Sequence, residues 1–137
     1  MQSAPRYTNV VAEVGAFLDE RVRACVAAGI SRDRLVLDPG IGFGKRLEHN
    51  LALLAGLPEL CRRGLPVLIG VSRKSMFGEL LGRPVDQRLA GSLASAITGV
   101  LAGASIVRAH DVAESCDALR VIEALHQAGY ARPVMKS

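Results

Sequence analysis

The stretch Leu35-Val36-Leu37-Asp38-Pro39-Gly40 is a short apolar run that ends in a charged residue and a turn. Because apolar and polar residues do not alternate in it, the run predicts a strand buried on both faces, as in parallel sheets. Residues 66–71 and 105–109 form two further runs of this kind. Helical stretches lie between the three runs, and this alternation predicts an α/β fold with a parallel sheet and helices outside it.

Helical periodicity occupies the segments before, between and after these strands. Thr8 or Asn9 can cap a first helix that ends at Gly29. Its apolar positions recur at steps of three and four residues, at Val11, Val14, Leu18, Val22 and Val26. A second helix is expected over about residues 48–62, with a break at Pro58.

The third helical region begins after Lys74, is interrupted at residues 82–84 and resumes from Asp86. One side of the resumed helix is apolar, at Leu89, Leu93, Ile97 and Val100 or Leu101. Small residues crowd its other faces, which indicates close packing on more than one side. A last helix over about residues 112–128 is apolar at Cys116, Leu119, Ile122 and Leu125.

The predicted order of elements is α-β-α-β-α-β-α. Three strands cannot close a barrel, which needs about eight, and an open sheet of three would leave long edges bare. We therefore expect residues 1–137 to form the C-terminal half of a (β/α)8 barrel domain, with three strands and four helices. The N-terminal half is expected to be absent from this chain.

The composition of the 137-residue chain is that of a globular protein, with 50% hydrophobic and 22% charged residues. A net charge of +4, spread over the helices, favours a small anionic substrate over nucleic acid. The most apolar stretch, residues 89–103, falls short of the roughly 20 residues that a membrane span needs. The three cysteines, Cys25, Cys61 and Cys116, indicate reduced thiols in a cytoplasmic protein.

The least ordinary residues stand at the carboxyl ends of the predicted strands, where ligands bind in folds of this kind. In chain order they are Asp38 with the glycine-rich residues 40–45, Gly70 with residues 72–75, and Arg108 with His110. Taken singly, each group has a structural explanation as a turn, a solvated helix start or a surface pair. Their presence at three consecutive strand ends favours a binding site.

Two familiar motifs are excluded at the glycine-rich loop. It is not a P-loop, because Arg46 follows Lys45 where Ser or Thr is required. It is not a dinucleotide-binding fingerprint, because Lys45 stands where the third glycine belongs. His49 and His126 have no metal-ligand spacing, so we interpret both as structural or exposed and expect no metal ligands in this chain.

The strand-end residues suit a flat, charged ligand. Asp38 can accept two parallel hydrogen bonds from an amino-substituted nitrogen heterocycle. Lys74 can donate to a ring carbonyl or ring nitrogen from the neighbouring strand. Arg108 can stack on a ring or bind phosphate, and His110 adds a donor for an anion. Phe43, on the glycine-rich loop, can close over a flat ligand.

Four segments together resemble dihydropteroate synthase over essentially the whole chain: residues 37–45, Asn50, residues 70–75 and residues 108–111. The resemblance implies a (β/α)8 barrel that joins 6-hydroxymethyl-7,8-dihydropterin diphosphate to 4-aminobenzoate in folate biosynthesis. The products would be 7,8-dihydropteroate and diphosphate. Sulfonamides would compete for the aminobenzoate site.

The resemblance also implies roles for individual residues. Asp38 and Lys74 would hold the pterin ring, Gly70 would line its slot, and Arg108 would stack on the ring and face the diphosphate with His110. The aminobenzoate pocket would be shaped by Phe43, Arg73, Lys74 and Ser75. Mg²⁺ is the implied cofactor, with its ligand in the absent N-terminal half, and Met1-Gln2 would match a pair that follows the fifth strand. A homodimer through the C-terminal helices is the implied assembly.

Two other interpretations stay open at this point. A pterin-binding methyltransferase of the corrinoid type has a similar Asp-based site, although the Ser-Arg-Lys-Ser sequence of residues 72–75 argues against it. A non-catalytic half-barrel that serves in assembly is the second. Without its N-terminal half, the chain alone is expected to be inactive.

Overall fold

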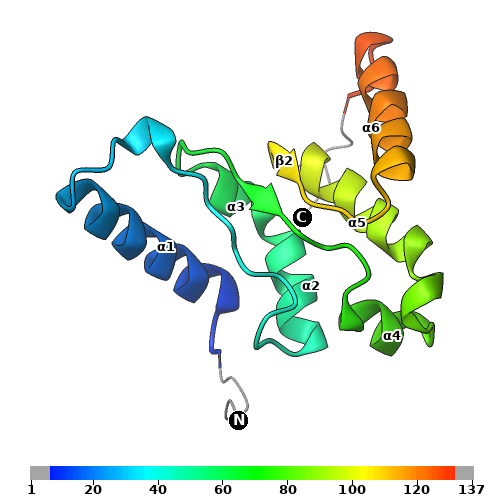
Figure 1. Ribbon diagram of the computed structural model, residues 1–137, viewed down its shortest axis with the longest axis horizontal. Helices are drawn as coiled ribbons and strands as arrows, with labels where there is room; N and C mark the ends of the chain where they lie inside the picture. The colour runs from blue at the N-terminus through cyan, green and yellow to red at the C-terminus, as the bar shows by residue number, and fades with distance from the viewer. Residues whose placement is uncertain (1–6, 132–137) are drawn as a thin grey trace.

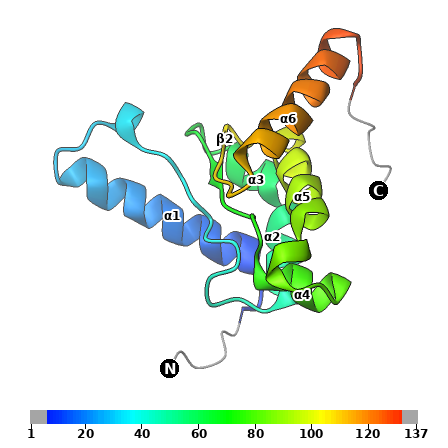
Figure 2. The same cartoon turned by 45° about the vertical axis from the view of Figure 1, so that its right-hand side comes forward.

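The computed structural model describes residues 7–131, so the Met1-Gln2 pair lies outside the described part. Its elements, in chain order, are α1 (Val10–Ala27), the 3-10 turn η1 (Arg32–Arg34), α2 (Leu47–Ala55), α3 (Leu57–Cys61), β1 (Leu68–Ile69), α4 (Ser75–Leu81), the 3-10 turn η2 (Val85–Gln87), α5 (Leu89–Leu101), β2 (Ile106–Val107) and α6 (Val112–Gln127). Helices α1 and α6 lie at opposite ends, with α2, α3 and the extended segments between them (Figures 1 and 2).

The extended segments run parallel, with β1 in the middle. Strand β1 pairs with β2, Leu68 opposite Ile106, and the residue before β1, Val67, forms a parallel bridge with Leu37. The parallel arrangement is therefore confirmed, but the predicted strand lengths are wrong. Within residues 7–131 the three runs shrink to one bridge residue and two strands of two residues each. No further strand in this part of the chain extends the ladder at either edge.

The first run is not buried on both faces, as the sequence had predicted. Leu37 is buried, with 4% of its surface exposed, whereas Val36 is 47% exposed. At the other edge of the sheet, Ile106 is 40% exposed. These residues lie on the outer segments, and among the described residues nothing packs over their second faces. In the middle segment Val67, Ile69 and Val71, which share one face, are buried, whereas Leu68 on the other face is half-buried.

Helix α1 begins where the sequence predicts. The side chain of Asn9 is the N-cap and accepts a hydrogen bond from the backbone N–H of Ala12 at 3.1 Å. Gly29, in the left-handed region with φ of +92°, follows the end of the helix. Val14, Leu18 and Val22 are buried, but Val26 is 47% exposed, contrary to prediction. The C-terminal end of α1 extends past α2 and α3, and the chain turns back there into η1 (Figure 1).

The break in the second predicted helix falls at Gly56 and not at Pro58. Pro58 lies in the first turn of α3, where its missing N–H has no helical partner to lose. A Cβ at position 56 would lie 2.6 Å from Cγ2 of Val11. Glycine is therefore required where α1 crosses the junction of α2 and α3.

The buried side of α5 is not the predicted one. Its buried residues are Ser92, Ala96 and Gly99, whereas Leu89 is 37% exposed. A Cβ at Gly99 would lie only 2.1 Å from Cδ1 of Ile69, so α5 approaches β1 too closely for large side chains. The expected close packing is confirmed, and it is this packing that places the small residues inside.

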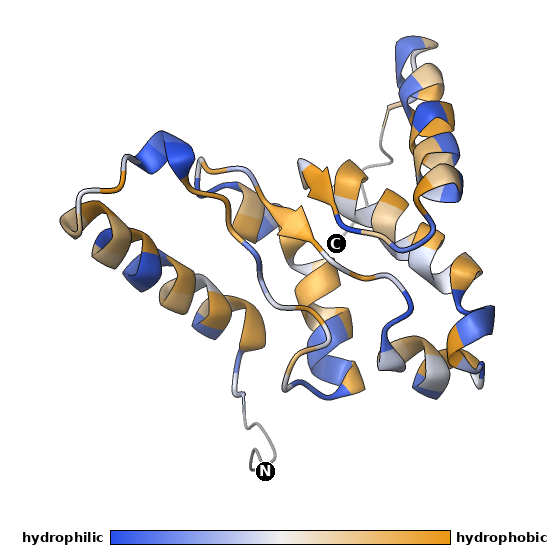
Figure 3. Ribbon diagram, in the orientation of Figure 1, coloured by the Kyte–Doolittle hydropathy of each residue, from blue (hydrophilic) through white to orange (hydrophobic). Residues whose placement is uncertain are grey.

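Helix α6 buries little of its predicted apolar side. Ser115 is its only buried residue, Cys116 is exposed and Leu125 is 45% exposed. Figure 3 shows mixed hydropathy along α6, in contrast to the hydrophobic strands β1 and β2. A groove of about 690 Å³ runs between α5 and α6, with Leu119 and Ile122 on its α6 side. Among residues 7–131 no helix is both long and apolar enough to cross a membrane.

Candidate functional site

A cleft of about 700 Å³ lies at the carboxyl ends of β1 and β2. The residues that line it are Phe43, Gly70, Ser72, Arg73, Lys74, Val85, Arg108, Ala109 and His110. All the predicted site residues are among them except Asp38, which contacts a lining residue, and Ser75, which does not line the cleft. Ser75 is instead the exposed first residue of α4, with Lys74 as its N-cap.

Asp38 and Arg108 form an ion pair across the end of β1, with 3.6 Å between Oδ2 of Asp38 and Nη2 of Arg108. The other carboxylate oxygen, Oδ1, accepts the backbone N–H of Gly40 at 2.8 Å, so the turn holds Asp38 in place. Gly70 lies beneath the pair, where a Cβ would come within 2.6 Å of Nη2 of Arg108. The guanidinium can lie over the strand end only because position 70 has no side chain.

The glycine-rich loop is held from inside by Asn50, which is only 3% exposed. Its Oδ1 accepts the backbone N–H of Gly42 at 2.7 Å, and its Nδ2 donates to the carbonyl of Lys45 at 3.4 Å. Nζ of Lys45 donates in turn to the carbonyls of Gly40 and Phe43, at 2.9 and 3.1 Å. Burial lowers the pKa of Lys45, and the nearby charge of Asp38 opposes that shift.

Lys74 lies where this loop meets the cleft. Its Nζ lies 3.7 Å from the centre of the Phe43 ring, in a cation–π contact. A Cβ at Gly42, whose φ is +83°, would lie 2.6 Å from Cδ of Lys74, so the loop requires glycine there. The pKa of Lys74 is lowered by burial and by the charge of Arg108, and raised in part by Asp38. The charges of Asp38 and Arg108 are thus close enough to affect the protonation of Lys74.

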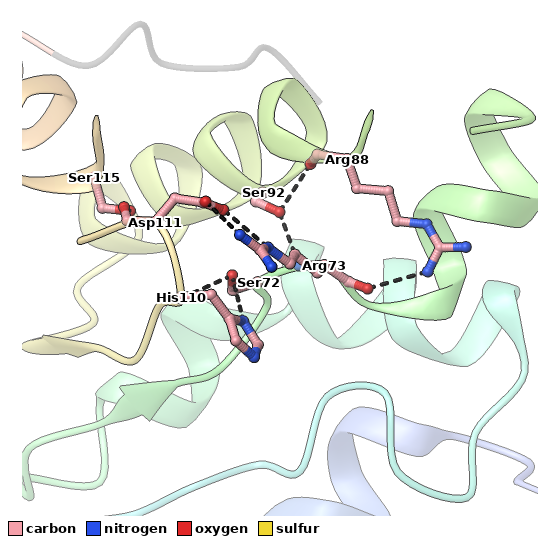
Figure 4. A network of polar contacts seen from close by, with 7 residues as sticks. All are labelled: Ser72, Arg73, Arg88, Ser92, His110, Asp111 and Ser115. Carbon is pink, nitrogen blue, oxygen red and sulfur yellow. Dashed lines mark hydrogen bonds and ion pairs between the residues drawn. The ribbon is translucent and has the colours of Figure 1, made fainter. Parts of the chain in front are cut away.

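Arg73 points away from the pair formed by Asp38 and Arg108. Its guanidinium binds both oxygens of Asp111, at 2.6 and 3.2 Å (Figure 4). This hydrogen bonding, together with the charge of Arg73, holds the pKa of Asp111 below its usual range. The backbone of Arg73 is in the left-handed region, with φ of 57°, which is uncommon for a residue with a side chain.

His110 is positioned by Ser72. The backbone N–H of His110 donates to Oγ of Ser72 at 3.1 Å, and its Nδ1 lies 2.9 Å from the same oxygen (Figure 4). Within residues 7–131 no partner is found for Nε2, so this nitrogen can face a ligand. Sequence reasoning overlooked Val85, Arg88 and Ser92, and it assigned no role to Ser72 or Asp111. Asp111 follows His110 directly, but nothing in the sequence pairs it with Arg73.

The carboxylates near the cleft do not form a metal site. Asp38 and Asp111 each pair with an arginine. No cluster of three or more His, Cys, Asp or Glu that could hold a metal ion occurs in the described part of the chain. The resemblance places the Mg²⁺ ligand in the N-terminal half, so the described residues do not test that expectation.

Comparisons with known proteins identify the family of the chain. The family described as pterin binding enzyme matches residues 1–110. Dihydropteroate synthase of Escherichia coli (strain K12) is 51% identical over 124 residues, which cover 90% of this chain and 44% of that protein. The chain spans about half the length of the curated relatives it matches.

Solved structures of dihydropteroate synthase from Xanthomonas albilineans are similar in fold as well as in sequence. The structure with 4-aminobenzoic acid has a TM-score of 0.88 and 50% identity, and the match covers 95% of this chain and 46% of that one. The structure in complex with 7,8-dihydropteroate has a TM-score of 0.88 and 49% identity, with 97% and 50% covered. On this evidence the chain belongs to the pterin-binding enzyme family.

Proposed function

We propose that this chain supplies the C-terminal part of the active site of a dihydropteroate synthase. The reaction would join 6-hydroxymethyl-7,8-dihydropterin diphosphate to 4-aminobenzoate, giving 7,8-dihydropteroate and diphosphate. The proposal depends on one observation: Asp38, Lys74 and Arg108 lie close together at the carboxyl ends of the parallel segments. Similarity to enzymes solved with 4-aminobenzoic acid and with 7,8-dihydropteroate supports it.

The pterin would bind against Asp38 and Arg108, at the end of β1. The carboxylate suits the amino group and ring N–H of a pterin, which can donate two parallel hydrogen bonds. Arg108 has a planar guanidinium above Gly70, and 57% of its side chain is exposed, so a flat ring can stack on it. Lys74, which lines the same cleft, would donate to a ring carbonyl or ring nitrogen.

The chemical step needs cations at the leaving group. The bond between the pterin methylene carbon and the diphosphate oxygen breaks, and its electron pair leaves with the diphosphate. The lone pair of the aminobenzoate nitrogen forms the new C–N bond, and that nitrogen releases a proton to solvent. Arg108 and Nε2 of His110 would stabilise the charge that develops on the diphosphate. No step is assigned to Mg²⁺, whose ligand would lie in the N-terminal half.

The aminobenzoate side of the cleft is less complete. Phe43 is 61% exposed and packs on the Lys74 ammonium, so both can contact an aromatic acid. Arg73 would first have to exchange Asp111 for the substrate carboxylate. The predicted contacts of Arg73 and Ser75 with aminobenzoate stay predictions.

Isothermal titration of the chain with 6-hydroxymethyl-7,8-dihydropterin diphosphate tests the proposal. We expect saturable heat at millimolar ligand for the native chain and none for Lys74→Met, which keeps the side-chain stem but removes the ammonium. Arg62→Met is the matched control, because Arg62 is an exposed cation remote from the cleft, at the end of α3. Titration of 4-aminobenzoate should then give heat only when pterin diphosphate is present.

The alternatives predict different results. A corrinoid-type methyltransferase site would bind a pterin without needing the diphosphate, and the comparisons do not favour it. A non-catalytic half-barrel would give no heat with either ligand. That outcome would contradict a residual substrate site in this chain.

We also propose that a second copy packs on the C-terminal helices. The support is the groove between α5 and α6 and the exposed apolar residues of α6, with Val112 at 61% and Val121 at 59%. Analytical ultracentrifugation should show a dimer for the native chain and a monomer for Val121→Asp.

We further propose a cytoplasmic location, which the three unpaired cysteines support.

A further inference from the structure

The backbone of Arg73 is held by two side chains of the α5 start. The N–H of Arg73 donates to Oγ of Ser92 at 2.9 Å, and its carbonyl accepts from Nη1 of Arg88 at 3.1 Å (Figure 4). The same Nη1 lies 3.4 Å from the carbonyl of Lys74. The backbone N–H and carbonyl of Arg73, a non-glycine residue in the left-handed region, therefore find their hydrogen-bond partners at the start of α5 and not within their own loop.

Arg88 and Ser92 are themselves fixed. Oγ of Ser92, in a residue that is 6% exposed, donates to the carbonyl of Arg88 at 2.8 Å. Nε of Arg88 donates to the carbonyl of Arg83 at 3.0 Å. A Cβ at Gly78 would lie 2.6 Å from Nη2 of Arg88, so the guanidinium lies against the backbone of α4. Glycine at position 78 provides the space that the arginine needs.

This contact can control the cleft because Lys74 directly follows Arg73. The left-handed backbone of Arg73 sets the direction in which the chain continues. As a result, the side chain of Lys74 extends toward the ring of Phe43. Ser72, on the other side of Arg73, holds His110. Neither Arg88 nor Ser92 lines the cleft.

We propose that Arg88 and Ser92 are positioning residues that hold Arg73 in its left-handed conformation and thereby place the Lys74 side chain in the cleft. The identity of the ligand rests on the proposed function, but the placement of Lys74 does not. Arg88 donates to the carbonyls of Arg73 and Lys74, and Ser92 accepts the N–H of Arg73, so losing either residue releases part of this segment.

The test uses the whole chain, three main variants and the conservative variant Arg88→Lys. Ser92→Ala removes the acceptor, Arg88→Gln removes the fork of donors, and Gly78→Ala displaces Arg88 without changing it. Ser95→Ala on the same helix and Arg83→Gln, whose side chain pairs with Gln87 at 3.2 Å, are the matched controls. The two readouts are the affinity for pterin diphosphate by calorimetry and the titration of Lys74 Nζ by NMR.

We expect each of the three variants to bind pterin diphosphate about tenfold more weakly or worse, since a small misplacement of a binding group is costly. The pKa of Lys74 should rise toward that of a free lysine. Arg88→Lys can donate to one carbonyl, so its affinity and its Lys74 pKa should lie between those of the native chain and of Arg88→Gln. Gly78→Ala is the decisive variant, because alanine favours the helix α4. It should weaken binding without lowering the thermal unfolding midpoint.

Affinity and Lys74 titration that match the native chain in Gly78→Ala and Arg88→Gln would overturn the proposal. If the native chain binds no pterin diphosphate, the proposed function fails, and the Lys74 titration alone decides the positioning role. Should Ser92→Ala not fold, Gly78→Ala and Arg88→Lys still decide the outcome.

Discussion

Asp38 and Arg108 meet 3.6 Å apart although they come from segments that are not neighbours in the sheet. Leu37, which precedes Asp38, bridges to Val67, and the strand before Arg108 pairs with the far side of β1. The ion pair therefore spans the end of the middle strand, above Gly70. The carboxylate and the guanidinium are in contact there, so a flat, polar ring that bonds to the carboxylate would lie directly beside the guanidinium.

Gly70→Ala should weaken pterin binding while leaving the fold intact. The new Cβ would lie 2.6 Å from Nη2 of Arg108, the free end of a flexible side chain that can swing away. We therefore expect an unfolding midpoint close to that of the native chain and at least about a tenfold loss of affinity. Calorimetry and thermal melts measure the two quantities. A loss of stability with native affinity would contradict this view of Gly70.

Asp38→Asn should weaken pterin binding more than it affects folding. Hydrogen bonds to a charged group contribute about 1.5–3 kcal/mol, and each 1.4 kcal/mol is about tenfold, so a ten- to hundredfold loss is expected. The ion pair itself is partly exposed, at 57% for Arg108 and 38% for Asp38, and should stabilise the fold by about 1 kcal/mol or less. Asp33→Asn, on an exposed turn, is the control and should bind normally.

The ion pair of Asp111 with Arg73 should make stability depend on acid pH. The pKa of Asp111 is lower in the folded chain than in the unfolded chain, so the carboxylate stabilises the fold above the unfolded value of about 4. This contribution is lost as pH falls from there through the folded pKa. The difference in unfolding midpoint between the native chain and Asp111→Asn should therefore be largest near neutral pH and vanish in acid. Asp117→Asn, from an exposed pair with Arg120, should show no such difference.

Asn50→Ala should loosen the glycine-rich loop. It leaves the backbone N–H of Gly42 without its partner at 2.7 Å in a half-buried position, which should cost about 1–3 kcal/mol of unfolding free energy. Urea denaturation measures that cost. Asn50→Asp keeps the acceptor for Gly42 and should lose less, and equal losses in the two variants would contradict the assigned hydrogen bond.

Gly99→Ala should destabilise the fold, although alanine is normally the better residue in a helix. The added Cβ would lie 2.1 Å from Cδ1 of Ile69, which is fully buried and cannot move aside. Overpacking of this kind typically costs about 1–3 kcal/mol. Thr98→Ala, at the neighbouring exposed position, should be neutral in the same denaturation experiment.

Several features could be read from short stretches of sequence because their causes are local. The Asn9 cap, the end of α1 at Gly29 and the interruption at Gly82 depend on residues a few positions apart. The alternation of helices with apolar runs identified the parallel arrangement. The rule that strand ends of such sheets lie at one edge then placed Phe43, Lys74 and Arg108 together.

Other features depended on distances between segments far apart in the chain. Gly56 and Gly99 are close contacts because Val11 and Ile69 approach them, and periodicity within one helix carries no information about that approach. Arg73 binds Asp111, 38 residues away, and is held by Ser92, 19 residues away. Local residue types thus specify the elements and the chemistry at their ends, whereas packing between elements decides which side chains face the cleft and which face each other.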